Sequence, residues 1–199
     1  MSESEAAIDT PFFRNNHYTL KRQILALNGK VRVYAPGELL VLYAEQKLFK
    51  LKEDIRLFSS DDKLMEVMRI QARNIIDFSA AYDVLDSQTQ THLGTLRRKG
   101  WRSVMRDEWE ILGASGELKA LVREDSKGKA LARRLLLGSW LPQSYDMINP
   151  RGETWGAFHQ RLNLFRYIMD IELVLDRIDH RLALSAAILL AIIEGKQDN

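Results

Sequence analysis

The stretch that decides the fold is Leu182–Ile193, LALSAAILLAII, near the end of the 199-residue sequence. As an α-helix it would span about 18 Å at ~1.5 Å per residue, which is short of the ~30 Å hydrocarbon core of a bilayer. Its small and apolar residues leave no polar face, so the helix must be enclosed by the rest of the protein. The sequence therefore predicts a buried central helix over residues 181–194, with a membrane-inserting hairpin or tail anchor as the alternative.

The chain before this helix has the pattern of β-strands separated by turns. Turn signals such as Asn28-Gly29 and Pro36-Gly37 recur about every 8 to 14 residues, which favours a closed or sandwiched antiparallel sheet. Residues 17–27 and 30–35 form the first expected hairpin, around Asn28-Gly29. Residues 38–58 are long enough for two strands or for one strand with a bulge. Along the whole chain we expect about ten to twelve strands.

The sheet and the terminal helix have complementary requirements. An open sheet of this size exposes two edges and an apolar face, whereas the helix needs complete enclosure. A barrel closed around the helix meets both requirements if it has enough strands to leave room for a helix. We therefore predict an α+β, mainly β, single domain over residues 17–195, a closed antiparallel barrel of about twelve strands around the C-terminal hydrophobic helix. Residues 1–16 are expected to be a flexible tail that becomes ordered near Phe12 and Phe13.

One segment, residues 127–140, does not have the pattern of a β-strand. Lys127–Trp140, KGKALARRLLLGSW, is rich in Ala, Leu and Arg; Gly138 can end a helix and Pro142 prevents its continuation. The segment predicts a short helix over residues 127–140. Its basic residues accompany leucines and a terminal tryptophan, a composition typical of helices at a lipid interface. The alternative is a helix packed on the end of the barrel with its arginines in water.

The composition excludes several classes of function. The chain has no cysteine, which excludes disulfides, thiolate catalysis and cysteine-ligated zinc and fits a reducing cytosol. It carries 29 Lys and Arg against 27 Asp and Glu, and a net charge of +2 produces no whole-molecule field that demands nucleic acid. The N-terminal residues 1–13 are acidic and polar, unlike a signal peptide.

Two segments resemble the LURP-one-related and phospholipid scramblase superfamily. In residues 81–112, AYDVLDSQTQTHLGTLRRKGWRSVMRDEWEIL, an aromatic-x-Val strand ends in Asp86, and a turn, Gly94, basic residues and a tryptophan-containing strand follow. Residues 176–195, DRIDHRLALSAAILLAIIEG, are similar to the closing segment of this family, a charged lead-in and an apolar helix. The resemblance covers residues 17–195. It implies a tubby-like fold, an antiparallel barrel of about twelve strands around a C-terminal hydrophobic helix.

The resemblance also implies roles at membranes, namely phosphoinositide binding in tubby-type members and proposed calcium-dependent lipid scrambling in scramblases. This sequence has neither the proline-rich N-terminal arm nor the palmitoylated cysteine cluster of scramblases. Asp170 and Asp176 stand in places comparable to acidic residues of their calcium-linked segment, but an acid expected within the helix falls at about Ala191. Because calcium prefers six to eight oxygen ligands in a compact loop, we expect no calcium site.

Basic residues concentrate between residues 97 and 134, with eleven bases against six acids. Arg97, Arg98 and Lys99 lie next to a glycine turn and could meet phosphate oxygens, for which the planar fork of arginine is suited. A solvated strand-turn face is the alternative. The candidate phosphate ligands are Arg97, Arg98, Lys99, Lys127, Lys129, Arg133 and Arg134, and the candidate membrane contacts are Leu137 and Trp140.

The sequence gives no positive argument for catalysis, a metal or a cofactor. Its histidines, His17, His92, His159 and His180, have no metal-binding spacing, and no nucleophile elbow, P-loop or dinucleotide-binding glycine motif is present. We expect a cytoplasmic, non-enzymatic binding protein with neither a nucleic-acid partner nor a transmembrane span. The resemblance to the LURP-one-related and scramblase superfamily implies that it is peripheral at the inner membrane face and contacts anionic phospholipid or phosphoinositide. The alternative is a cytosolic protein-interaction or regulatory module without lipid binding.

Overall fold

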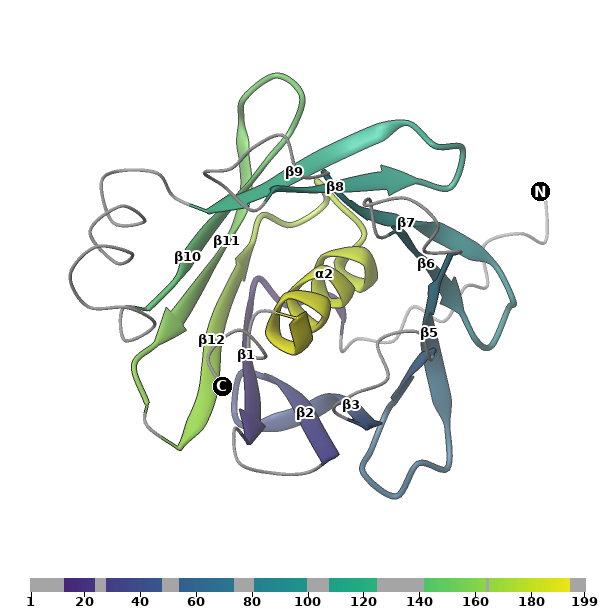
Figure 1. Cartoon of the computed structure of the whole chain (residues 1–199), viewed down its shortest axis with the longest axis vertical. Helices are drawn as coiled ribbons and strands as arrows, with labels where there is room; N and C mark the ends of the chain where they lie inside the picture. Colours follow the sequence, from purple (N-terminus) through teal and green to yellow (C-terminus); the bar gives the residue numbers. More distant parts are fainter. Residues whose placement is uncertain are drawn as a thin grey trace.

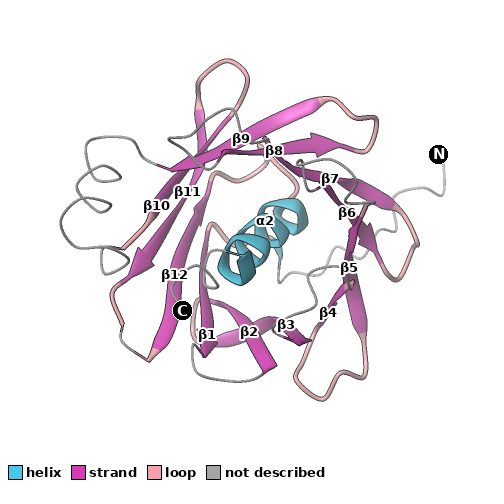
Figure 2. Ribbon diagram, in the orientation of Figure 1, coloured by secondary structure: helices cyan, strands magenta, loops and turns pink. Residues whose placement is uncertain are grey.

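The computed structural model describes residues 13–23, 28–47, 54–73, 81–99, 108–124, 142–163 and 165–193. In this part of the chain, twelve antiparallel strands close into a barrel around the helix α2, His180–Ile193 (Figures 1 and 2). The strands are β1 His17–Gln23, β2 Asn28–Ala35, β3 Leu39–Lys47, β4 Ile55–Phe58, β5 Glu66–Ala72, β6 Ala81–Asp86, β7 His92–Arg98, β8 Glu108–Gly113, β9 Leu118–Glu124, β10 Ser144–Ile148, β11 Thr154–Arg161 and β12 Arg166–Leu173. The predicted tubby-like barrel around a C-terminal hydrophobic helix is confirmed.

Each strand pairs with the strands before and after it in the chain, and β1 pairs with β12 to close the ring. The closing register runs from His17 opposite Glu172 to Gln23 opposite Arg166. Closure removes the free edges that an open sheet of this size would expose. It also brings the two ends of the described barrel sequence onto one face, formed by β12, β1 and β2.

The two rims of the barrel differ. At one rim, which we call the turn rim, lie the hairpin turns β2–β3, β4–β5, β6–β7, β8–β9 and β10–β11 and the link from β12 to α2. All five of these hairpins contain a register shift, for example between Val33 and Tyr34 or between Ile111 and Leu112. A bulge bends its strand and increases the local twist, so these shifts help to curve the sheet into a barrel. The opposite rim holds the end of β1 and the C-terminal end of α2.

Side chains alternate between the lumen and the outer face of the barrel. Along β1, Tyr18, Leu20 and Arg22 are buried while their neighbours are partly or fully exposed. In α2 every residue except Arg181 is buried, so the helix is enclosed as its composition predicts. Burial of each Leu or Ile side chain contributes about 1.5–3 kcal/mol, which makes this helix the largest single part of the core.

Gly94 on β7 marks a close approach between the wall and the helix. A Cβ atom at this position would lie 2.2 Å from the carbonyl oxygen of Leu112 and 3.2 Å from the Leu182 side chain of α2. Any larger residue would therefore displace the neighbouring strand backbone. Close packing of β7 against β8 and α2 therefore requires a glycine at position 94.

The N-terminal end of α2 is held by charged groups at the turn rim. Asp179 caps the helix, because its Oδ1 accepts a hydrogen bond from the N–H of Arg181 at 2.9 Å. The Arg181 guanidinium donates from Nη1 to Oδ2 of the buried Asp86 at 2.7 Å. Oδ1 of Asp86 in turn accepts the N–H groups of Gln88 and Thr89 in the β6–β7 turn. This network ties the start of the helix to one hairpin of the wall.

The C-terminal end of α2 is held by one side chain from β1. Arg22 is 3% exposed, and its Nη1 donates to the carbonyl oxygen of Ala191 at 2.6 Å. A cation is favourable at this place because it complements the negative end of the helix dipole and satisfies a carbonyl of the last turn. Burial lowers the pKa of Arg22, although an arginine remains charged at neutral pH.

Several details differ from the sequence-based expectations. Asn28-Gly29 is not the first hairpin turn, because both residues belong to β2 and pair with Lys47 and Gln46 of β3. The helix begins at His180, one residue before the expected start, since Asp179 serves as its cap. The 38–58 stretch contains two strands, β3 and β4.

Other expectations fall partly or wholly outside the described residues. These include the short helix over 127–140, residue 194 and most of the 1–16 tail. Within the tail, Phe13 packs against the core and the carbonyl oxygen of Asn16 accepts the N–H of Leu173 at 2.8 Å. None of the helices in the described part of the chain has the length and hydropathy needed to cross a bilayer.

Candidate functional site

The basic cluster at the end of β7 forms ion pairs with the neighbouring strand. Arg97 donates from Nε to Oε2 of Glu110 at 2.6 Å, and Lys99 pairs with Glu108 and lies 3.7 Å from a second carboxylate oxygen of Glu110. Arg98, between them, is partly buried on the same strand. The charges of two of the three predicted phosphate ligands are therefore balanced by carboxylates of β8. This arrangement is a cross-strand ladder of ion pairs on the outer wall.

The other predicted contacts lie in the connection between β9 and β10. This connection leaves β9 after Glu124 and reaches the described chain again at Pro142, at the rim opposite the turns. The six predicted residues concerned all lie outside the described residues: Lys127, Lys129, Arg133, Arg134, Leu137 and Trp140. They stay predictions from the sequence.

A different basic site lies on the face where the barrel closes. A groove of about 150 Å³ crosses the outer side of β12, β1 and β2 near the opposite rim. We call it the basic groove, and its outward-facing side chains are Lys21, Gln23, Lys30, Arg32, Tyr34 and Arg166. Arg22 also borders it, but the Arg22 side chain turns into the lumen toward α2. No carboxylate and no histidine borders the groove among the described residues.

Strand register places these cations in two rows. Arg166 lies opposite Gln23 of β1, and Lys21 lies opposite Arg32 of β2. Neighbouring strands are about 4.8 Å apart, so side chains of the three strands are within reach of a single phosphate group. Lysine and arginine donors on both sides of a groove supply the charge and hydrogen bonds that a phosphate accepts.

Only part of this positive charge is balanced by carboxylates. Lys21 pairs with the exposed Glu38 at 2.8 Å and lies over the Tyr34 ring, 4.7 Å from its centroid. Arg32 is 3.5 Å from Asp61. In the described part of the chain, neither Lys30 nor Arg166 forms an ion pair. Lys30 lies opposite Glu45 of β3, and its charge helps to lower the pKa of that carboxylate. Within the described residues, Arg166 is therefore the groove cation with the least compensation by a carboxylate.

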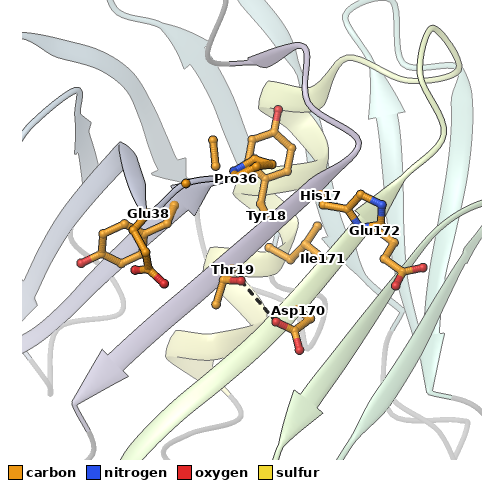
Figure 3. A pocket seen from close by; sticks show the side chains of 11 residues that line it. His17, Tyr18, Thr19, Pro36, Glu38, Asp170, Ile171 and Glu172 are labelled. Carbon is orange, nitrogen blue, oxygen red and sulfur yellow. Dashed lines mark hydrogen bonds between the residues drawn. The ribbon is translucent and has the colours of Figure 1, made fainter.

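The closing face carries the opposite charge near the turn rim, from β12 and from the turn after β2. A pocket of about 460 Å³ there is bordered by Glu38, Asp170 and Glu172, together with His17 and Thr19 (Figure 3). Figure 3 shows the Glu38 carboxylate on one side of β1 and the Asp170 and Glu172 carboxylates on the other. Asp170 accepts a hydrogen bond from the Thr19 hydroxyl at 3.3 Å. The closing face is thus acidic toward the turn rim and basic toward the opposite rim.

The aspartates and histidines singled out in the sequence lie apart. Asp170 is on β12, where it pairs with Arg161 at 2.9 Å, and Asp176 is in the link before α2. No group of three or more histidine, aspartate or glutamate side chains in the described ranges is placed to hold a metal ion. His180 is buried at the start of α2, where a 3.4 Å hydrogen bond joins its Nδ1 to the Tyr18 hydroxyl. Burial raises the pKa of Tyr18 to about 12.

A signal for the basic groove is present in the sequence but incomplete. Lys30, Arg32 and Tyr34 alternate with Val31 and Val33, a pattern that predicts a strand with a basic outer face. The pairing of Lys21 with this face follows once β1 and β2 form a hairpin. Arg166 joins the site only because the last strand pairs with the first, and this follows from barrel closure.

Comparisons with known proteins agree with the fold. No protein-family model and no curated protein matches the sequence. The structure is similar to the X-ray structure of an Arabidopsis thaliana protein, from locus AT5G01750, with a TM-score of 0.52 and 12% sequence identity. The match covers 92% of this chain and 96% of the other. At this identity the similarity shows a shared barrel fold, and membership of the LURP-one-related superfamily stays a prediction from the sequence.

Proposed function

We propose that this barrel is a non-enzymatic binding protein that contacts anionic phospholipid at the cytoplasmic face of a membrane through the basic groove. The observation that carries the proposal is the groove itself, in which four cations from three strands surround about 150 Å³ without a bordering carboxylate among the described residues. Phosphate oxygens are the natural partner of such a site, because guanidinium and ammonium groups donate short, charge-assisted hydrogen bonds to them.

The distribution of charge around the barrel supports a surface rather than a small soluble anion as the partner. The described turns and the link at the turn rim carry seven carboxylates against three cations, namely Glu38, Asp61, Asp62, Glu117, Glu153, Asp176 and Asp179 against Lys63, Arg151 and Arg177. An anionic bilayer repels this rim and attracts the groove, so the charges orient the barrel as it approaches. Near a membrane surface each lysine or arginine contributes about 1 kcal/mol.

Co-sedimentation with vesicles tests the proposal. We expect the protein to sediment with vesicles of phosphatidylcholine and phosphatidylserine at low salt but not with vesicles of phosphatidylcholine alone. Raising the ionic strength should release it, because salt screens exposed charges over about 10 Å at 0.1 M. If the protein stays in the supernatant with phosphatidylserine vesicles at low salt, the proposal is contradicted, because salt then screens the attraction between the charges only weakly. Binding to both vesicle types regardless of salt would contradict the role of the cations.

A further inference from the structure

The tip of the β11–β12 hairpin exposes two large apolar side chains beside the basic groove. Leu162 is 66% exposed and Phe165 is 72% exposed. The hairpin between β11 and β12 lies at the rim opposite the turns, where β12 begins beside the end of β1 (Figure 1). The side chain of Asn163 accepts the N–H groups of Phe165 and Arg166 at 3.0 and 2.9 Å, so the backbone on this side of the tip is satisfied locally.

The position of this tip relative to the groove is fixed by strand pairing. Phe165 directly precedes Arg166, and Arg166 lies opposite Gln23 at the end of β1. With a rise of about 3.3 Å per residue along a strand, Phe165 lies just beyond the last cation of the groove toward the rim. On the other strand of the hairpin, Leu162 directly follows Arg161. Each apolar side chain therefore has an arginine next to it on the barrel side.

This order of groups matches the order of groups in a bilayer. Cations that meet lipid phosphates lie at the headgroup level, and apolar or aromatic side chains one step further reach the boundary with the acyl chains. Exposed apolar side chains also occur at the turn rim, for example Leu64 at 87% and Val174 at 46%. The turn that carries Leu64 also carries Asp61 and Asp62, and the link that carries Val174 also carries Asp176 and Asp179, which an anionic bilayer repels. Among the described residues, the hairpin tip is the exposed apolar element that fits an anionic membrane.

We propose that Leu162 and Phe165 insert into an anionic bilayer while the basic groove holds lipid phosphates, so that the barrel docks with the β11–β12 hairpin toward the membrane. This inference rests on the proposed function and adds to it a second, hydrophobic contact and an orientation. It commits the site to a bilayer: a soluble phosphorylated headgroup offers the groove its phosphate but offers the hairpin tip no apolar phase.

A single fluorescent label at the tip tests insertion. Because the sequence contains no cysteine, a Leu162→Cys substitution gives one labelling site for a polarity-sensitive dye. The matched control is Leu64→Cys in the β4–β5 turn, a leucine of the turn rim that is even more exposed than Leu162. On phosphatidylserine-containing vesicles we expect the emission of the Leu162→Cys label to shift to the blue, as in an apolar phase, and the emission of the Leu64→Cys label to stay as in water.

The same samples distinguish failure of the insertion from failure of the proposed function. If both labelled proteins sediment with the vesicles and the Leu162→Cys label remains aqueous, insertion is wrong while lipid binding stands. If neither protein sediments, lipid binding itself is contradicted and the insertion with it. A blue shift at both positions would contradict the orientation.

Truncation of the ring gives an independent measurement. A partly inserted Phe contributes enough apolar burial that Phe165→Ala should weaken vesicle affinity about tenfold. Its affinity for a soluble inositol phosphate should stay at the wild-type value, because the groove is unchanged. Equal vesicle affinities of Phe165→Ala and the wild type would overturn the proposal.

Discussion

The two ends of the central helix are each held by an arginine, partly buried at one end and buried at the other, in different ways. Arg181, at the turn rim, belongs to α2 and reaches out to the wall, where it pairs with Asp86 at 2.7 Å and with Asp179 at 2.7 Å. Arg22, at the opposite rim, belongs to the wall and reaches in to the Ala191 carbonyl oxygen. Its Nε has no hydrogen-bond partner, and no carboxylate pairs with it in the described part of the chain.

The difference shows how the barrel divides its charges between its two rims. At the turn rim, acids and bases compensate one another: burial acts to lower the pKa of Arg181, but the hydrogen bonds and charges of Asp179 and Asp86 outweigh it and raise that pKa. At the opposite rim, the ion pairs of β7 with β8 compensate charge in the same way, but on the closing face Arg22 inside the barrel and Arg166 outside it form no ion pair among the described residues. We infer that the turn rim holds the fold together and that the opposite rim is the binding surface.

The largest loss in the free energy of unfolding should come from a change that prevents the helix from occupying the lumen. Leu189 is 1% exposed in α2, and Leu189→Asp places a charge without a partner in the lumen. We expect a loss of more than about 5 kcal/mol, enough to abolish soluble folding. Leu64→Asp, on the surface of the turn rim, is the control and should stay within about 0.5 kcal/mol of the wild type. Solubility and circular dichroism measure both, and a folded Leu189→Asp protein would show that the helix is not enclosed.

The next largest effect compares the two arginines directly. Arg181→Met leaves the buried Asp86 carboxylate without its partner, and we expect the unfolding free energy to fall by about 3–5 kcal/mol. Arg22→Met removes a buried charge that has no ion pair among the described residues and leaves one helix carbonyl unsatisfied, so we expect a loss below about 1.5 kcal/mol. Urea unfolding measures both variants. Equal losses, or a larger loss for Arg22→Met, would contradict the difference between the rims.

A smaller effect is the dependence of stability on pH at the turn rim. Burial lowers the pKa of His180, against the influence of Asp179, the Phe13 backbone and Asp176. The unfolded chain, with a histidine pKa of about 6.5, then takes up a proton that the folded protein does not. The unfolding free energy should therefore fall as the pH drops below about 6.5, by at most about 1.4 kcal/mol per pH unit, until the folded pKa is reached.

Replacement of this histidine isolates its contribution. His180→Gln keeps a polar group beside the Tyr18 hydroxyl but cannot titrate, so its unfolding free energy should be flatter over the same pH range. Urea unfolding at several pH values measures the two slopes. An identical slope for the variant and the wild type would mean that another group causes the acid sensitivity.

The sequence predicted the architecture because the architecture follows from the need to bury apolar surface. Leu182–Ile193 has no polar face, and a barrel is the arrangement of many short strands that encloses such a helix. Local signals were less decisive: Asn28-Gly29 has the composition of a tight turn, yet continued pairing with β3 keeps it in a strand. Pairing with a neighbouring strand therefore outweighs the preference of the Asn-Gly dipeptide for a turn.

The sites were harder to predict because they join residues that are distant in the sequence. The wall partner of Arg181 is Asp86, 95 residues away, across a contact that only the folded barrel creates. Arg97 and Lys99 were predicted as phosphate ligands, and the carboxylates that pair with them come from β8. Arg166 meets Lys21 and Lys30 only through the closure of β12 on β1.

The affinity of a groove variant for anionic vesicles tests most directly whether the opposite rim binds lipid while the turn rim stabilises the fold. Lys30→Glu with Arg166→Glu reverses the two groove cations that lack ion pairs in the described chain. Arg151→Glu with Arg177→Glu is the matched control, since it makes the same change in net charge with two exposed arginines of the turn rim. We expect the groove variant to lose about thirtyfold or more in affinity for phosphatidylserine-containing vesicles, while its unfolding free energy stays within about 0.5 kcal/mol of the wild type. Equal affinities of the groove variant and the control would contradict the account.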